Sequence, residues 1–101
     1  MTDDVTLPKE QEIERVVRLF KAFGDRTRYR IITVLACGPR TVNELASQVD
    51  LSQPATSQQL KVLRQAGLVV GKRDGRYIYY QLTDQHVLTI LEQVRAHTQI
   101  G

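Results

Sequence analysis

The sequence predicts a single, mainly helical domain that includes one β-hairpin. Apolar residues recur with the spacing of a helix face in five stretches, while the stretch "LVVGKRDGRYIYYQL" places β-rich runs on both sides of Asp74–Gly75, a dipeptide suited to a tight turn. The predicted order is helix, helix, helix, helix, strand, strand, helix. At 101 residues, the chain is long enough for one small core and too short for two, so residues 1–101 form one domain.

The first two helices are marked by their apolar spacing and by the residues that stop them. The first is expected over 10–23, ends before Gly24, and has an apolar face made of Ile13, Val16, Val17 and Phe20. Asp25 is a candidate N-cap for the second helix, "RTRYRIITVLAC", which Gly38–Pro39 ends.

The third and fourth helices are separated by only a short turn. Thr41 and Glu44 form a capping box, in which each side chain can satisfy a backbone N–H of the first turn. Ser52 can cap the fourth helix, and Pro54 falls in its first turn, where a missing N–H costs little. The residues expected on its inner face are Thr56, Leu60 and Leu63. Two short helices joined in this way are typical of a helix-turn-helix, here over 41–66.

The middle of the chain carries its positive charge. Residues 1–25 hold four basic and six acidic side chains, residues 26–82 hold nine and three, and residues 83–101 hold one and two. A polyanion is therefore expected to bind to the middle. The hairpin over 68–82 has basic residues around its tip, as a wing that reaches along a phosphate backbone would need. The combination predicts a winged helix-turn-helix.

The outer face of the fourth helix predicts contacts with double-stranded DNA. Serine, threonine and glutamine near its start can donate to and accept from base edges. Basic side chains there and on the wing would neutralise phosphates, which gives position and affinity but reads no sequence. The residues predicted to contact DNA are Ser52, Gln53, Thr56, Ser57, Gln58, Lys61, Arg64, Lys72, Arg73 and Arg76.

Three stretches closely resemble the ArsR/SmtB family of dimeric winged-helix repressors. They are "LFKAFGDRTRYRIITVL" (19–35), "TVNELASQVDLSQPATSQQLKVLRQAGLV" (41–69) and "KRDGRYIYYQL" (72–82). The resemblance covers nearly the whole chain and implies a homodimer that represses an operon until an effector weakens its binding to DNA. Thr56 stands where the family commonly has an aliphatic residue, and Gln58 or Gln59 where it commonly has histidine, so the operator sequence cannot be inferred from the family.

Both histidines, His86 and His97, fall in the last helix, expected over 83–98. Eleven residues at about 100° each put them within about 20° of one face, but about 16 Å apart along the axis. A metal ion binds imidazole at about 2 Å, so one chain cannot bring both to one ion. If the helix packs antiparallel against its mate in a second chain, His86 of one chain meets His97 of the other, and symmetry makes the site twice. The apolar stripe beside them, which such pairing needs, is Val87, Ile90, Leu91 and Val94.

Asp84-x-His86, ten residues and then His97 resembles the metal motif DxHx10HxxE/H of zinc-, cobalt- and nickel-responsive family members. The resemblance implies a metal site of Asp84, His86 and His97 for Zn(II), with Co(II) or Ni(II) as alternatives. The motif's fourth ligand falls at Ile100, so water, a bidentate carboxylate or the C-terminus would have to complete the coordination. The alternative interpretation is that both histidines are ordinary surface residues of an amphipathic helix.

The family's other metal site, a cysteine cluster commonly written ELCVCDL, has no counterpart, because this chain reads "ELASQVDL" there. The single cysteine, Cys37, excludes an internal disulfide and is expected to be a small buried residue. Its alternative role is that of a redox sensor that joins its mate across a dimer.

Other classes of function fit the sequence less well. No nucleophile, base and orienting group come together, so an enzyme is not predicted. No apolar run is long enough to span a membrane, and the N-terminus is acidic where a signal peptide would be basic, so a cytoplasmic protein is expected. Two alternatives stay open: a repressor that responds to another effector or to none, and a small metal-buffering or protein-interaction module with no role on DNA.

Overall fold

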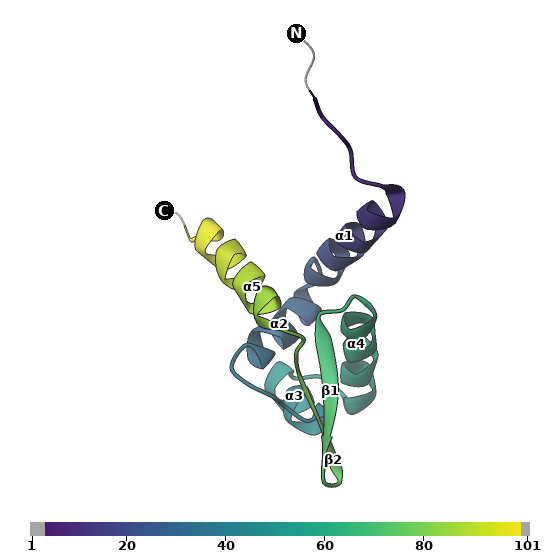
Figure 1. Cartoon of the computed structure of the whole chain (residues 1–101). Coiled ribbons are helices and arrows are strands. Elements are labelled where there is room, and N and C mark those ends of the chain that lie inside the picture. The colour runs from purple at the N-terminus through teal and green to yellow at the C-terminus, as the bar shows by residue number, and fades with distance from the viewer. Residues whose placement is uncertain (1–3, 100–101) are drawn as a thin grey trace.

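The computed structural model describes residues 4–99 and confirms the predicted order of elements (Figure 1). The elements are α1 (Glu10–Phe23), α2 (Arg26–Leu35), α3 (Val42–Val49), α4 (Gln53–Gln65), β1 (Val69–Asp74), β2 (Tyr77–Leu82) and α5 (Gln85–Thr98). Among these residues, no helix combines the length and the apolar character that crossing a bilayer requires.

The predicted N-caps begin three of the helices. The side chain of Asp25 accepts a hydrogen bond from the backbone N–H of Arg28 (3.0 Å), and that of Ser52 accepts one from Ala55 (3.2 Å). The capping box before α3 is complete, since Thr41 and Glu44 bond each other's backbone N–H groups at 2.8 and 3.2 Å. These bonds satisfy donors that the first turn of each helix leaves unpaired, which fixes where the helices begin.

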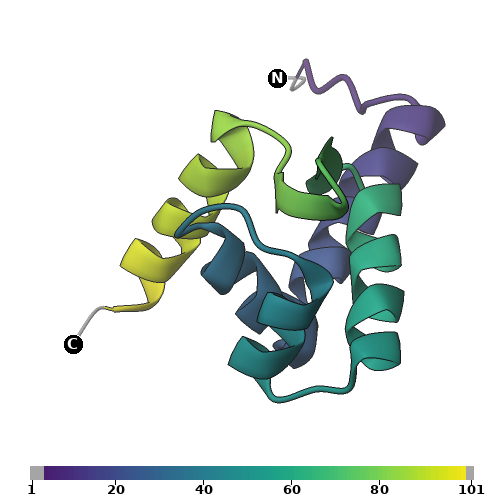
Figure 2. The same cartoon turned by 90° about the horizontal axis from the view of Figure 1, so that it is seen from below.

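One core joins α2, α3, α4, the base of the hairpin and the start of α5. Its buried members include Ile31, Ile32, Leu35, Leu45, Leu60, Leu63, Leu68, Val69, Val87 and Leu91. α3 and α4 pack across α2, and the turn that joins them lies at one end of α4 (Figure 2). The core therefore holds α4 with one side turned inward and the other free.

The predicted apolar face of α1 is not part of this core. Val16 is 45% exposed and Phe20 66% exposed, and Ile13 and Val17 are similarly uncovered. α1 instead contacts its own chain through the neighbouring face, on which the core-packed residues are Leu19, Ala22 and Phe23. α1 thus has two apolar faces, and one of them lacks a partner within the described chain.

The hairpin turns one residue later than its sequence indicated. Asp74 pairs with Tyr77, so the turn consists of Gly75 and Arg76. Gly75 has φ +64°, whereas Arg76 has a negative φ, which is the pattern of a type II′ turn that suits the twist of a hairpin. At its base the hairpin is joined to the loop before α3, because Arg40 and Tyr80 exchange two backbone hydrogen bonds of 2.9 and 2.7 Å.

Candidate DNA interface and metal site

The helix-turn-helix and the hairpin form one continuous surface. α4 packs beside β1, and the hairpin tip projects beyond the helices (Figure 1). The guanidinium of Arg64 lies over the ring of Tyr80 on β2, 5.8 Å from its centroid, a cation–π contact between α4 and the hairpin. This contact adds to the packing of α4 against β1 in holding the hairpin beside the helix.

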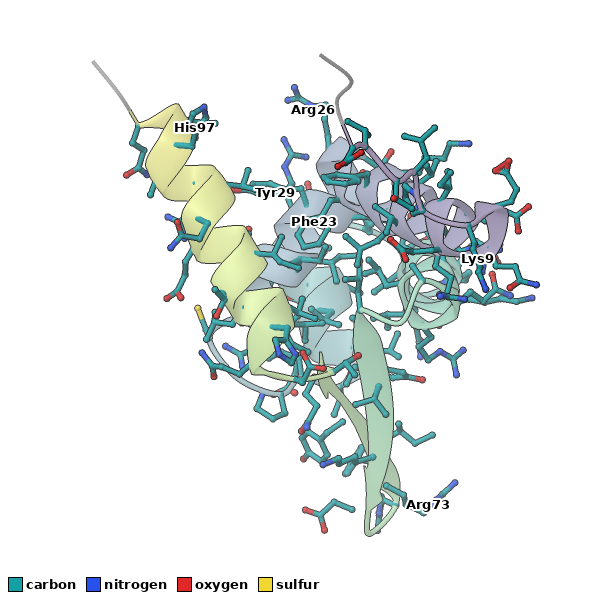
Figure 3. All side chains as sticks on the ribbon, turned by 45° about the horizontal axis from the view of Figure 1, so that its top comes forward. Lys9, Phe23, Arg26, Tyr29, Arg73 and His97 are labelled. Carbon is teal, nitrogen blue, oxygen red and sulfur yellow. The ribbon has the colours of Figure 1, made fainter. Side chains whose placement is uncertain are left out.

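Nine of the ten residues predicted to contact DNA are exposed on this surface. Six lie at the cap and along the outer face of α4, and Arg73 lies near the tip of the hairpin (Figure 3). The exposed residues are Ser52, Gln53, Ser57, Gln58, Lys61, Arg64, Lys72, Arg73 and Arg76. The surface therefore offers hydrogen-bonding groups on α4 and five cations on α4 and the hairpin, a combination suited to reading bases and neutralising phosphates.

Thr56 is the exception and corrects the prediction of a DNA contact at this position. It is completely buried, and its hydroxyl donates to the carbonyl of Ser52 at 2.9 Å. A threonine can occupy this apolar position because a helix carbonyl four residues earlier satisfies its hydroxyl. The inward orientation expected for Thr56 is correct, and its assignment to the DNA surface is wrong.

Replacing Thr56 with valine should leave operator affinity unchanged and alter the free energy of unfolding by no more than about 1 kcal/mol. The reason is that the Ser52 carbonyl still accepts from the backbone N–H of residue 56 at 3.0 Å. Fluorescence anisotropy on operator DNA and urea denaturation measure the two quantities. The control is Ser57→Ala, an exposed position one residue away, which should weaken DNA binding by about 1 kcal/mol. Equal losses of affinity in the two variants would contradict the buried role of Thr56.

Arg28 is a positioning residue that the sequence did not indicate. Its guanidinium donates to the carbonyls of Ala22 (3.1 Å) and Lys21 (3.2 Å) at the end of α1, and to the side chain of Gln59 on α4 (3.0 Å). One planar fork thus joins α1, α2 and α4. The side chain of Gln59 accepts this hydrogen bond from Arg28, whereas Gln58 is exposed. Of the two glutamines that stand where the family commonly has histidine, only Gln58 is therefore available to contact DNA. No spacing rule reveals a bond across 31 residues.

Two of the predicted metal ligands lie together at the start of α5. Asp84 is the N-cap of this helix, and its Oδ1 accepts from the backbone N–H groups of His86 (2.9 Å) and Val87 (3.3 Å). The same oxygen lies 3.4 Å from Nδ1 of His86, whose side chain is 90% exposed. Oδ2 of Asp84 has no hydrogen bond among residues 4–99. A carboxylate oxygen and an imidazole are therefore presented side by side.

The third predicted ligand, His97, lies in the last turn of α5, away from the other two (Figure 3). Within residues 4–99, no three His, Cys, Asp or Glu side chains come together to hold a metal ion. His86 and His97 are thus held at opposite ends of one helix. Ile100, at the fourth ligand position of the motif, is outside the described residues. The oxygen and nitrogen donors suit a divalent ion such as zinc, but each end of α5 supplies only part of a site.

Cys37 corrects a second prediction, because its side chain is exposed rather than buried. α2 ends at Leu35, two residues earlier than "RTRYRIITVLAC" indicated, so Cys37 belongs to the turn after the helix. Its thiol lies 3.8 Å from the carbonyl of Thr33.

Comparison with known proteins places this architecture in a family. Residues 25–70, which span α2 to the start of β1, match the family described as bacterial regulatory protein, arsR family. The chain is 40% identical over 89 residues to the HTH-type transcriptional regulator NmtR of Mycobacterium tuberculosis, covering 88% of this chain and 74% of that one. It is 35% identical over 88 residues to the transcriptional repressor SmtB homolog of Synechocystis, covering 87% and 67%.

A solved structure confirms the winged helix-turn-helix fold. The homodimeric winged helix-turn-helix DNA-binding domain of a Mycobacterium bovis protein superposes with a TM-score of 0.87 and 26% identity, covering 96% of this chain and 90% of that one. The family and these relatives are transcriptional regulators and not enzymes, in agreement with the prediction from the sequence. The chain belongs to the ArsR family of bacterial regulatory proteins and is a winged-helix transcriptional regulator.

Proposed function

We propose that the chain is a homodimeric, cytoplasmic repressor that releases operator DNA when a metal ion binds between its paired α5 helices. The ion is Zn(II), with Co(II) or Ni(II) as alternatives. The name of one relative describes a repressor, and the structural neighbour is homodimeric, which supports the first part of the proposal. The observation that carries the metal part is the pair of exposed histidines on one face of α5, at opposite ends of the helix.

The dimer is supported by apolar surface that the single chain leaves uncovered. The four exposed residues of α1, from Ile13 to Phe20, form a stripe along most of the helix. The apolar residues of α5 face two environments: Val87 and Leu91 are buried in the chain's own core, whereas Val94 is 49% exposed. A contiguous apolar face of this kind marks a surface that binds protein. Covering both helices with a second copy would bury it.

The DNA part is supported by the arrangement of α4 and the hairpin. In a twofold dimer the two α4 helices are set in successive major grooves, about 34 Å apart. Each hairpin would then place Lys72, Arg73 and Arg76 along the adjacent phosphates. Because Arg64 and Tyr80 connect α4 to the hairpin, both contacts form at once when one half of the dimer binds.

The metal part depends on α5 and its connection to the core. In an antiparallel pair, Asp84 and His86 of one chain would meet His97 of the other, so each ion would hold both chains. Bound there, zinc would supply strong, directional bonds to oxygen and nitrogen that fix the angle between the paired helices. Val87 and Leu91 anchor α5 in the core, so a change in that angle would move the two α4 helices relative to each other. Coupling between metal and DNA is then reciprocal.

The dependence of DNA affinity on salt tests the DNA part of the proposal. On a duplex selected from a random-sequence library, the logarithm of the binding constant should fall steeply as the logarithm of salt concentration rises, because phosphate contacts release counterions. Replacing Lys72, Arg73 or Arg76 with alanine should lower this slope by about one each. Lys9→Ala, an exposed cation before α1, serves as the control and should leave the slope unchanged. A flat salt dependence would favour the module with no role on DNA.

A further inference from the structure

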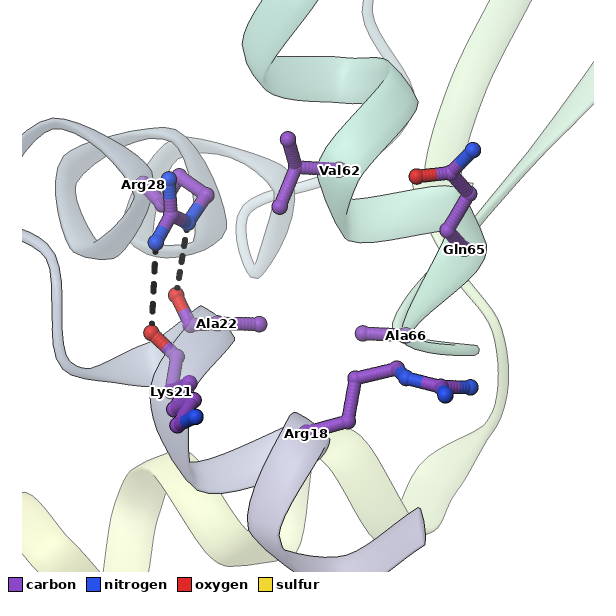
Figure 4. Close-up of a pocket in the computed structure, with 7 residues that line it drawn as sticks. All are labelled: Arg18, Lys21, Ala22, Arg28, Val62, Gln65 and Ala66. Carbon is purple, nitrogen blue, oxygen red and sulfur yellow. Dashed lines mark hydrogen bonds between the residues drawn. The ribbon is translucent and has the colours of Figure 1, made fainter. Parts of the chain in front are cut away.

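A basic cavity lies between α1, α2 and the end of α4, and neither the DNA surface nor the predicted metal site uses it. Figure 4 shows the residues that line it, and its volume is about 610 Å³. Three of its seven lining residues are cations, one is a polar amide, and the other three are small apolar residues. The lining consists of Arg18, Lys21, Ala22, Arg28, Val62, Gln65 and Ala66.

One of the three cations is held rigidly. The guanidinium of Arg28 makes hydrogen bonds through Nε, Nη1 and Nη2, two of them to the carbonyls of Lys21 and Ala22 (Figure 4). Arginine has five N–H groups, so one on each terminal nitrogen remains without a partner among residues 4–99. A guanidinium fixed in this way loses little conformational entropy when an anion binds to it.

The three cations share the cavity without a balancing acid. Among residues 4–99, no carboxylate oxygen lies within 4.0 Å of the charged nitrogens of Arg18, Lys21 or Arg28. Like charges around one hollow repel one another and slightly destabilise the folded state, and an anion bound between them adds attractions that offset this repulsion. The amide of Gln65 adds a hydrogen-bond donor, and Val62, Ala22 and Ala66 add an apolar wall.

The cavity borders the other two surfaces but shares no residue with the predicted DNA contacts or with the apolar stripe of α1. On α4, Val62 lies about 160° around the axis from Arg64, so the cavity and the hairpin lie on opposite flanks of the helix. Gln65, beside the cavity, is about 18 Å along the axis from Gln53 at the start of α4. On α1, Arg18 lies about 140° or more from the middle of the exposed apolar stripe, whereas Lys21 lies about 90° from it, and both line a second hollow with Ile13 and Val17. Gln65 lies about 20° around the axis from Gln58 and about 10 Å further along it, so the cavity adjoins the outer face of α4 at the end of the helix.

We propose that this cavity binds a small anion that carries a phosphate or carboxylate group, with a short apolar part against Val62 and Ala66. Arg18, Lys21 and Arg28 bind the charged group, and Gln65 donates to it. The bound anion connects the end of α1 to the last turn of α4, the same two helices that Arg28 already joins. This inference does not depend on the proposed metal response.

Titration of the full chain with inorganic phosphate, and separately with citrate, tests the site. Chloride holds the ionic strength constant, and isothermal calorimetry and amide chemical shifts report binding. We expect saturable binding, with shift changes concentrated around Arg18, Lys21 and Gln65. Arg18→Gln with Lys21→Gln should weaken it about tenfold or more, as expected when two charge-assisted hydrogen bonds are lost. Binding of phosphate alone or of citrate alone identifies which group the site prefers, and either supports the proposal.

The matched control removes the same charge from the same region outside the cavity. Lys9→Gln with Arg15→Gln alters two exposed cations and should retain the affinity for the anion. Circular dichroism checks that all variants are folded. The proposal is overturned if neither anion saturates, or if both double variants lose binding equally. It is also overturned if Arg18→Gln with Lys21→Gln lowers the salt slope of DNA binding by about two, since the cations would then be DNA contacts. The anion titrations need no DNA, so they stand even if the repressor proposal fails.

Discussion

Phe20→Glu is expected to convert the protein to a monomer and to weaken its binding to operator DNA by about a hundredfold or more. Phe20 is 66% exposed on α1, so a charge there leaves the chain's own core intact while making the apolar stripe unsuited to a partner chain. Two linked α4 helices bind two half-sites with a high effective concentration, and a monomer loses this advantage. Sedimentation velocity gives the oligomeric state, and fluorescence anisotropy gives the affinity.

The control for this variant is Gln11→Glu. It adds the same charge to an exposed position of the same helix, about 180° around the axis from Phe20. This variant should remain dimeric and bind operator DNA with unchanged affinity. If Phe20→Glu stayed dimeric, the partner surface would lie elsewhere, and the pairing of His86 with His97 would lose its geometric basis.

Zinc is expected to lower operator affinity by about 5- to 150-fold, the usual range for coupling between two sites on one protein. His86→Ala and His97→Ala should each abolish this effect while leaving the affinity of the metal-free protein unchanged, because neither side chain belongs to the surface that α4 and the hairpin tip present to DNA. Gln93→Ala is a suitable control, since Gln93 is exposed on the same face of α5 between the two histidines. Anisotropy titrations with Zn(II) and with a chelator measure the ratio. Equal affinity under both conditions would favour a repressor with another effector, for which the exposed thiol of Cys37 is then the residue to test.

Mixing the two inactive histidine variants separates a site between chains from one within a chain. In a heterodimer of His86→Ala with His97→Ala, one end of the α5 pair keeps an intact His86 opposite an intact His97. That end should bind zinc, although neither homodimer does. If each chain coordinated zinc by itself, no mixture would regain binding. The readout is zinc content after subunit exchange, measured on the dimer fraction.

Local signals in the sequence predicted local structure well. The caps at Asp25, Thr41 and Ser52 each satisfy backbone N–H groups within three residues, so the residue type at one position decides the outcome. The hairpin was predicted but its turn was displaced by one residue, because Asp74–Gly75 and Gly75–Arg76 both satisfy the preference for a glycine with positive φ. Pairing of the flanking strands, which no local rule contains, selects between them.

Features that depend on distant parts of the chain were not predictable in this way. The apolar spacing on α1 showed a helix face, but not whether its own core or another molecule covers that face. The helix has two apolar faces, and the stripe with the stronger pattern is the exposed one. The contact between Arg28 and Gln59 likewise follows from how α2 and α4 pack. The helix period placed Thr56 correctly on the inner face of α4, and only its polar side chain led to the incorrect assignment to the DNA surface.

The two backbone hydrogen bonds between Arg40 and Tyr80 limit how this regulator can work. They fasten the root of the hairpin to the start of the helix-turn-helix, and Arg64 holds the same tyrosine from the other side. The helix-turn-helix and the hairpin of each subunit therefore contact DNA as one rigid unit, whose internal arrangement does not change. An effector then has to change the distance and the angle between the two DNA-binding units of the dimer. A truncated, monomeric subunit would bind DNA with an affinity that the effector does not alter.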